Sequence, residues 1–351
     1  MKSFEKEIRH SIAREYTIRR EGFDQENSPC LPRNNRSSMI LSMSEKDVDS
    51  YWLSEDQVQL KLKAKFKSKL KLKLEYSQFY QHQSQMPEPD SVFSTNLGSK
   101  VDVNIWAFDA LILSDFELVV AVKSMFEQMS FMDDFKVNNR ELVNFTWRCH
   151  YYYTRNKNAF HNFYHGVNVC HGGCYFLQKN ATLAKLSSYK KYAFVVACLC
   201  HDLDHRGKTN SFESGTKSDL AIRYLDNSPL ENHHVATMFL ILNNSDCNIF
   251  KHVADDQMAE IKKNMIENIL ATDMKQHIPI LSDFKKKLLT SSEICKLAII
   301  QDSEADSDLV SKIFIKCADI SGSAKPTSIA TKWSRLVAQE FSAQVISYKT
   351  V

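Results

Sequence analysis

An apolar run that leads directly into a cluster of ionisable residues constrains this chain most. Tyr192–Cys200 contains only aromatic, aliphatic and thiol side chains, and His201-Asp202-Leu203-Asp204-His205 follows it at once. A helix that is apolar on every side predicts burial inside a large helical bundle. Four titratable groups beside such a segment are costly to bury, and coordination to a metal ion is one way to offset that cost.

The pattern after about residue 100 predicts further helices. Ser114 and Glu117, like Asn138 and Glu141, have the spacing of a helix-capping box ahead of an apolar run. Apolar residues also recur at helical steps in Ile261, Met265, Ile269, Leu309, Ile313, Cys317 and Ile320. Only 8 glycines and 7 prolines interrupt the 351 residues, and this part has no Asn-Gly or Asp-Gly hairpin signal. The sequence therefore predicts an all-α domain over residues 99–351, with its site between buried helices.

Residues 1–98 differ from the rest because they are polar and rich in Ser, Gln, Asn and Lys. In the run Leu60–Leu74, Lys alternates with mostly apolar residues. This composition predicts a poorly ordered N-terminal extension. The alternation also fits a strand, or a basic segment that contacts anionic lipid at a membrane surface.

Charge and cysteine usage indicate a cytoplasmic protein without a nucleic-acid partner. The formal net charge is +3, which is too small to predict nucleic-acid binding. The nine cysteines lie mostly in apolar runs, as is typical of reduced core thiols. The charged N-terminus has no secretory signal, and the longest strongly apolar run is too short to span a bilayer. We therefore expect no transmembrane segment, while the oligomeric state is not predicted.

Three segments place His and Asp residues where the helical pattern predicts core. His161 and His165, at positions i and i+4, share one face of a helix. His201 and Asp202 follow the buried run, and Asp319 follows an apolar helical segment, although a helix cap or an ion pair would explain Asp319 alone. Two His and two Asp suit a zinc-type ion, with Mg²⁺ or Mn²⁺ sharing a carboxylate. His161 is not needed as a ligand, and it can supply the acid that protonates a leaving alkoxide in phosphodiester hydrolysis.

Five segments occur in the order and at the spacing of motifs shared by a known enzyme family. They are His161-Asn162-x-x-His165, His201-Asp202-x-Asp204-His205-x-Gly207-x-x-Asn210, Leu230-Glu231-Asn232-His233-His234, Ala271-Thr272-Asp273-Met274-x-x-His277, and Ala318-Asp319-Ile320-Ser321 with Lys325-Pro326. In these segments the chain resembles the class I 3′,5′-cyclic-nucleotide phosphodiesterases, from about residue 100 to its end. The resemblance implies a compact, HD-like multi-helix catalytic domain. It also implies hydrolysis of cAMP, cGMP or both to 5′-monophosphates in signal transduction.

The resemblance further implies a role for each matching residue. A zinc ion would be held by His165, His201, Asp202 and Asp319. Asp202 would bridge to a second ion, Mg²⁺ or Mn²⁺, and His161 would be the general acid. The water molecules on the metals would be oriented by His205, Glu231 and Thr272.

The chain also departs from the family pattern. Phe160 stands where the family usually has Tyr, and Gly322 stands where it has an Asn that lies near the purine in relatives. In the family, helices beyond the one around Trp333 carry a Gln and a Phe that bind the base, whereas this chain stops at Val351. We therefore expect a catalytic domain that lacks its C-terminal base-binding helices, and no base-binding residue is predicted.

Two other functions fit parts of this pattern. One is a catalytically weak or inactive phosphodiesterase-like protein with a binding or regulatory role, which the missing base-binding residues favour. The other is a different HD-type phosphohydrolase. That enzyme would share the pair His201 and Asp202, but it would not explain the segments at Leu230 and Ala271.

Local features near the motifs have simpler explanations than chemistry. The segment Cys170–Cys174 has the composition of a zinc knuckle, but its helical spacing favours ordinary packing. Gly172 and Gly173 are unfavourable within a helix and therefore predict a close approach of two helices. Asp273 and His277, at i and i+4, have the spacing to pair with each other.

Overall fold

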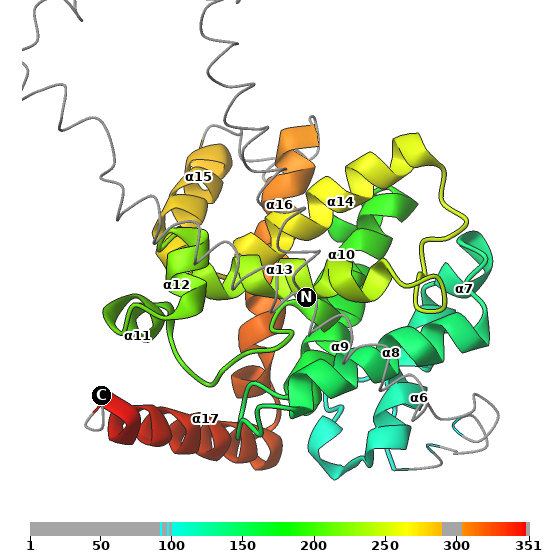
Figure 1. Cartoon of the computed structure of the whole chain (residues 1–351). Coiled ribbons are helices and arrows are strands. Elements are labelled where there is room, and N and C mark those ends of the chain that lie inside the picture. Colours follow the sequence, from blue (N-terminus) through cyan, green and yellow to red (C-terminus); the bar gives the residue numbers. More distant parts are fainter. Residues whose placement is uncertain (1–91, 93–96, 98–99, 290–303, 349–351) are drawn as a thin grey trace, which may run out of the picture. The chain divides into compact units, whose positions relative to one another are not determined.

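A computed structural model describes residues 92, 97, 100–289 and 304–348 (Figure 1). Every regular element within these residues is a helix and none is a strand, which confirms the predicted all-α class. The predicted N-terminal extension and its run Leu60–Leu74 lie outside the described residues, apart from Val92 and Leu97. None of the described helices combines the length and the apolar composition that crossing a membrane requires.

The labels of the elements follow Figure 1. The long helices are α6 (Asp115–Gln128), α8 (Asn139–Thr154), α9 (Phe163–Lys179), α10 (Ser188–Cys200), α13 (Pro229–Leu242), α14 (Asp255–Leu270), α15 (His277–Leu289), α16 (Glu304–Asp319) and α17 (Thr327–Tyr348). The short α-helices are α7 (Phe131–Asp134), α11 (Asn210–Gly215) and α12 (Asp219–Tyr224). The 3₁₀ turns are η2 (Ala110–Ile112), η3 (Leu183–Lys185), η4 (Met274–Gln276) and η6 (Ile320–Ala324).

Helix α10 lies inside the bundle, as its apolar run predicts. It packs against α9, α13, α14 and α16 (Figure 1). Every residue from Tyr192 to Cys200 is fully buried. The rings of Phe126, Phe131 and Phe135 contact Tyr192 at the other end of the apolar run. The buried helix therefore carries its C-terminal end, and the ionisable cluster that follows, into the interior.

The two predicted capping boxes are present. The Ser114 side chain accepts a hydrogen bond from the Glu117 backbone, and the Glu117 carboxylate accepts one from the Ser114 backbone. Asn138 and Glu141 make the same reciprocal pair at the start of α8. Each cap contributes about 1 kcal/mol to the helix that it starts. Both helices pack on α9, which carries the predicted ligand His165.

The buried face of α16 differs from the one that the sequence pattern predicts. The helical spacing predicts that Leu309, Ile313, Cys317 and Ile320 face the core. In the structure Leu309 and Ile313 are half-buried, Cys317 is exposed, and Ile320, just beyond the helix, is 68% exposed. The buried face instead contains Ser311, Ile315 and Ala318. A Cβ on Gly172 of α9 would lie 3.4 Å from the Ala318 Cα and 3.2 Å from the Ser321 Oγ, so the two helices are already in close contact at this glycine. The predicted close approach at Gly172 is therefore confirmed, and Ala318 is the residue of α16 that lies against it.

The described cysteines behave as core thiols. All seven are free, and only Cys317 among them is exposed. Cys170 and Cys174 are buried in α9 and belong to no candidate metal group among the described residues, which agrees with ordinary packing. A Cβ on Gly173 would lie 2.8 Å from the Cys198 Sγ, so α9 and α10 also meet at a glycine.

Candidate active site

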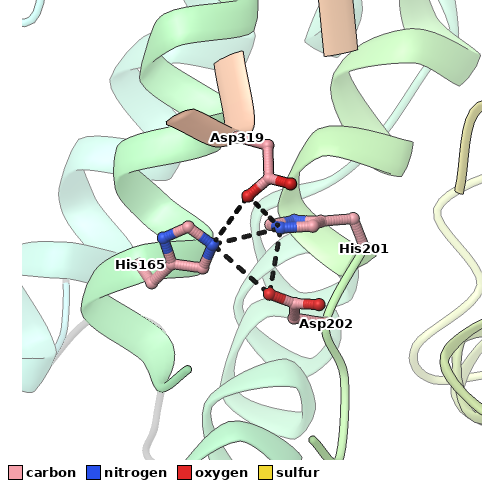
Figure 2. A group of neighbouring side chains, drawn as sticks. All are labelled: His165, His201, Asp202 and Asp319. Carbon is pink, nitrogen blue, oxygen red and sulfur yellow. Dashed lines mark hydrogen bonds and ion pairs between the residues drawn. The ribbon is translucent and has the colours of Figure 1, made fainter. Parts of the chain in front are cut away.

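Four side chains from three helix ends converge on one point (Figure 2). His165 lies in the first turn of α9, His201 and Asp202 follow α10, and Asp319 is the last residue of α16. The Nε2 atoms of the two histidines are 3.1 Å apart. Each lies 3.1–3.3 Å from the Asp202 Oδ2 and from the Asp319 Oδ1. The four residues that the sequence predicts as ligands are therefore brought together.

This spacing and the hydrogen bonding of His201 fit a divalent cation. Ligand bonds of about 2.1 Å place neighbouring ligand atoms roughly 3.0 to 3.4 Å apart, from octahedral to tetrahedral geometry. The Nδ1 of His201 lies 2.9 Å from the Cys198 carbonyl oxygen, to which it donates. In the neutral ring the Nε2 then carries a lone pair that faces the oxygens of Asp202 and Asp319. A cation among these atoms would receive both this lone pair and the charge of the two carboxylates.

The electrostatics of the cluster lead to the same conclusion. Burial raises the pKa of the Asp202 and Asp319 carboxyls, but the imidazoles of His201 and His165 outweigh burial and hold both pKa values well below their usual range. Burial lowers the pKa of His201, but the two carboxylates outweigh it and hold this pKa well above its usual value. Without a metal the cluster therefore retains protons, and metal binding would displace them.

Tyr153 of α8 supports the backbone that carries two of the ligands. Its buried hydroxyl donates to the Leu199 carbonyl oxygen at 2.9 Å. The same hydroxyl accepts from the Asp202 N–H at 3.1 Å. One side chain thus satisfies backbone groups on both sides of His201 at the end of α10.

Asp204 belongs to the ionisable cluster in the sequence, but the structure places it outside the ligand group. Its carboxylate accepts two hydrogen bonds from Arg155 and one from the His233 Nε2 at 2.7 Å. The Asn156 side-chain amide also donates to it, at 2.9 Å. Burial raises the pKa of Asp204, but these partners outweigh burial and lower it to about 2. Asp204 therefore ties the turn after the ligands to the end of α8 and to α13.

His161, the predicted acid, lies beside the ligands with its Nε2 4.0 Å from the Asp202 Oδ2. Its Nδ1 is hydrogen-bonded to the Glu340 Oε1. The Glu340 Oε2 accepts from the backbone N–H groups of Phe160 and His161, at 2.8 and 3.0 Å. Burial lowers the pKa of His161, but the hydrogen bond to Glu340 and the Asp202 charge outweigh burial and raise it. The imidazolium form that an acid needs is therefore favoured.

Glu340 is not among the site residues that the sequence predicts. This residue lies on α17, is 6% exposed and follows the buried Trp333 by seven positions. A carboxylate two helical turns from a buried tryptophan lies on the inward face of the helix, and that placement was the available signal.

Two further histidines lie beside Asp202. The Gly207 N–H donates to the Nδ1 of His205 at 3.0 Å, so the neutral His205 ring carries its proton on Nε2. The rings of His205 and His161 stack at 3.9 Å. His234, for which the sequence predicts no role, donates from Nδ1 to the Leu203 carbonyl oxygen, and its Nε2 lies 3.5 Å from the Asp202 Oδ1. His205 can therefore donate to a water, whereas His234 presents a lone pair.

Glu231 and Thr272 lie farther from the ligands. The Glu231 carboxylate accepts from the Asn210 amide at 2.8 and 3.1 Å, and burial together with the Asp273 charge raises the Glu231 pKa to about 7. The Thr272 hydroxyl donates to the Ile269 carbonyl oxygen at 2.7 Å. Within the described part of the chain, neither residue bonds directly to a predicted ligand, so a role through water remains a prediction.

Comparisons with known proteins agree with this geometry. The family model of the 3′5′-cyclic nucleotide phosphodiesterases matches residues 160–350. The chain is 32% identical over 256 residues to the 3′,5′-cyclic-nucleotide phosphodiesterase regA of Dictyostelium discoideum, which covers 73% of this chain and 31% of that protein. It is 33% identical over 237 residues to the human high affinity cGMP-specific 3′,5′-cyclic phosphodiesterase 9A, covering 68% of this chain and 38% of that protein. The chain thus spans well under half the length of these two relatives.

Solved structures extend the similarity to the fold. The phosphodiesterase domain of the RhoPDE fusion protein from the choanoflagellate Salpingoeca rosetta superposes with a TM-score of 0.66 at 28% identity, over 75% of this chain and 79% of that one. LmjPDEB1 in complex with IBMX gives a TM-score of 0.68 at 28% identity, over 75% and 78%. The matched region contains the ligands, the predicted acid and Glu340. The chain therefore belongs to the 3′,5′-cyclic nucleotide phosphodiesterase family.

Proposed function

We propose that this chain hydrolyses a 3′,5′-cyclic nucleotide to the 5′-monophosphate. The observation that carries the proposal is the convergence of four metal-ligand side chains beside a histidine whose protonated form is stabilised. The alternative of an inactive relative has no support in this geometry, because the predicted ligands and the predicted acid all lie together.

The donor set fits two divalent cations, with Zn²⁺ at the four ligands and Mg²⁺ or Mn²⁺ on the Asp202 Oδ1 side. When bound, these ions would lower the pKa of a water molecule and neutralise the charge of the phosphate. Two histidine Nε2 atoms and two carboxylates suit the first ion, because imidazole is a good zinc ligand. Asp202 would be the carboxylate shared by the two ions, because its Oδ2 faces His165 and His201 while its Oδ1 faces His234.

The side chains around the ligands would handle the protons. His161 would give its Nε2 proton to the departing 3′ oxygen, while Glu340 holds the opposite nitrogen and stabilises the cationic ring. His205 would direct its Nε2–H toward a water molecule, as its bond from Gly207 fixes the tautomer. Glu231, with a pKa raised to about 7, can exchange a proton with water at neutral pH.

The expected location is the cytoplasm. Seven described cysteines are free thiols, which suits a reducing compartment. The substrate is proposed only as a cyclic nucleotide, and both cAMP and cGMP belong in the test.

The test measures hydrolysis of cAMP and of cGMP by the purified chain with Zn²⁺ and Mg²⁺ and after removal of both ions by a chelator. We expect turnover of at least one nucleotide that depends on metal. His161→Ala should reduce kcat by about 100-fold or more while zinc content stays unchanged. His252→Ala, at an exposed position on the surface, is the matched control. Absence of turnover in a protein with bound metal would refute the proposed hydrolysis. Loss of zinc from His161→Ala would refute the role of His161 as the acid.

A further inference from the structure

Asp319 is the least enclosed of the four ligand residues. Its side chain is 29% exposed, against 0–1% for His201 and His165 and 12% for Asp202. It is the last residue of α16 and directly precedes η6, and its side chain makes no capping hydrogen bond. Asp319 therefore joins two elements, and the contacts of η6 can help to fix its carboxylate together with those of α16.

The start of η6 is held by α9. The Asn168 side-chain amide donates to the Ser321 Oγ at 3.1 Å, and both side chains are buried. A Cβ on Gly172 would lie 3.2 Å from the same hydroxyl oxygen. These contacts hold the residues just after Asp319 against the helix that carries His165.

The end of η6 is held by a segment far away in the sequence. The indole Nε1 of Trp106 donates to the carbonyl oxygen of Ala324, the last residue of η6, at 2.9 Å. Lys325, the next residue, donates from its Nζ to the Trp106 carbonyl oxygen at 2.9 Å. The same Nζ lies 4.3 Å from the centre of the Trp106 ring. The Trp106 side chain thus binds the backbone of Ala324, and the Lys325 side chain binds the backbone and the ring of Trp106.

His171 on α9 fixes the Trp106 segment in turn. Its Nε2 donates to the Ile105 carbonyl oxygen at 3.1 Å, and its Nδ1 accepts from the Lys325 Nζ at 3.1 Å. The His171 ring stacks on Phe108 at 4.5 Å. Burial and the Lys325 charge lower the pKa of His171 to about 3, so the ring is neutral and can make both bonds at once. We call residues 103–109 the strap.

The strap also reaches α17, because the Asp109 carboxylate pairs with Lys332 at 2.9 Å. It is therefore bonded to the end of η6, to α9 and to the helix that supplies Glu340. None of these bonds involves a predicted ligand or the predicted acid directly.

We propose that the strap positions the Asp319 carboxylate for metal binding, through the bond from Trp106 to Ala324 and the bonds of Lys325. Trp106 and Lys325 are positioning residues, because they act only through η6. The inference rests on the proposed metal site, but it does not depend on which nucleotide, if any, is hydrolysed.

The test is the affinity for the first equivalent of Zn²⁺, measured without nucleotide by competition with a chromogenic chelator. Trp106→Phe keeps an aromatic ring and removes the indole donor. We expect its zinc dissociation constant to rise by about 10-fold, the lower end of the effect of outer partners on metal affinity. Trp147→Phe is the matched control, because Trp147 of α8 is also an aromatic residue stacked on two rings, those of Phe116 and His150. Its zinc dissociation constant should stay within twofold of that of the parent chain.

A double variant separates positioning from general loosening. In the Asp319→Asn background, Trp106→Phe should have little further effect on zinc affinity, because the carboxylate that the strap positions is gone. Lys325→Met gives a second, independent loss of strap bonds, and we expect it to weaken zinc binding in the same way. An unchanged zinc dissociation constant in folded Trp106→Phe, an equal rise in Trp147→Phe, or a full effect in the Asp319→Asn background would each overturn the proposal. Since nucleotide is absent, failure of catalysis leaves this measurement intact.

Discussion

Replacing Glu340 by Gln should shift the pH dependence of the reaction. Glu340 gives one oxygen to the His161 Nδ1 and the other to the backbone N–H groups of Phe160 and His161. In Glu340→Gln the amide oxygen would stay with the backbone donors, so its NH₂ group would face the Nδ1. A donor that faces the Nδ1 favours the neutral ring and opposes the imidazolium.

The size of the shift follows from the lost bond. A hydrogen bond to a charged group contributes about 1.5–3 kcal/mol, and 1.36 kcal/mol corresponds to one pKa unit. The His161 pKa, which Glu340 raises, should therefore fall by about 1–2 units. The acid must be protonated to act, so its activity is present below this pKa and lost as the pH rises through it. The alkaline limb of the kcat/KM profile should move to lower pH by the same amount.

The assay is the pH profile of cyclic-nucleotide hydrolysis, with zinc content measured on the same samples. Glu127→Gln, an exposed carboxylate of α6 paired with Lys123, is the matched control and should leave the profile in place. The reasoning is refuted if the alkaline limb of Glu340→Gln coincides with that of the control. A loss of zinc would instead show that Glu340 supports the ligands and not the acid.

Three further outcomes are expected. Gly173→Ala should lower the free energy of unfolding by about 1–2 kcal/mol, since its Cβ would lie 2.8 Å from the Cys198 Sγ; adding Cys198→Ala should recover part of that loss in chemical denaturation. Tyr153→Phe should cost about 1–3 kcal/mol of stability, because the buried Asp202 N–H and Leu199 carbonyl lose their partner, and calorimetry would detect it. Burial lowers the pKa of Lys325 from 10.5 to about 7. As the pH rises, Lys325 therefore loses its proton at a lower pH in the folded state than in the unfolded state. Stability should therefore rise between pH 7 and 10.5 by up to about 1.4 kcal/mol per pH unit relative to Lys325→Met, and an equal slope in both proteins would contradict this.

The sequence predicts the parts of the site that local patterns can carry. The run Tyr192–Cys200 indicates a buried helix because every face is apolar, and His201 and Asp202 follow it inside the protein. The capping boxes at Ser114 and Asn138 depend only on residues three positions apart, and both are present. The ligand set required the family motifs as well, since a lone carboxylate such as Asp319 looks like a helix cap.

Tertiary contacts decided what the sequence could not. The pairing of Asp273 with His277 did not occur, because Asp273 accepts from the Ser228 hydroxyl at 2.7 Å and from the Lys275 N–H at 2.9 Å. Glu340 was missed because its partner, His161, is 179 positions away in the sequence. The inward face of α16 depends on the helices that it packs against, α9, α10, α14 and α15, and no pattern within α16 itself contains that information.

The bond from Trp106 to Ala324 has a consequence for biosynthesis, because these residues are 218 positions apart. The strap is synthesised early and η6 late. Trp106 therefore cannot form its bond to the Ala324 carbonyl oxygen until most of the domain has been translated. His165, His201 and Asp202 are likewise made before Asp319. A nascent chain therefore presents an incomplete, three-residue ligand set throughout the synthesis of the intervening helices, and the fourth ligand arrives together with the backbone that holds it in place.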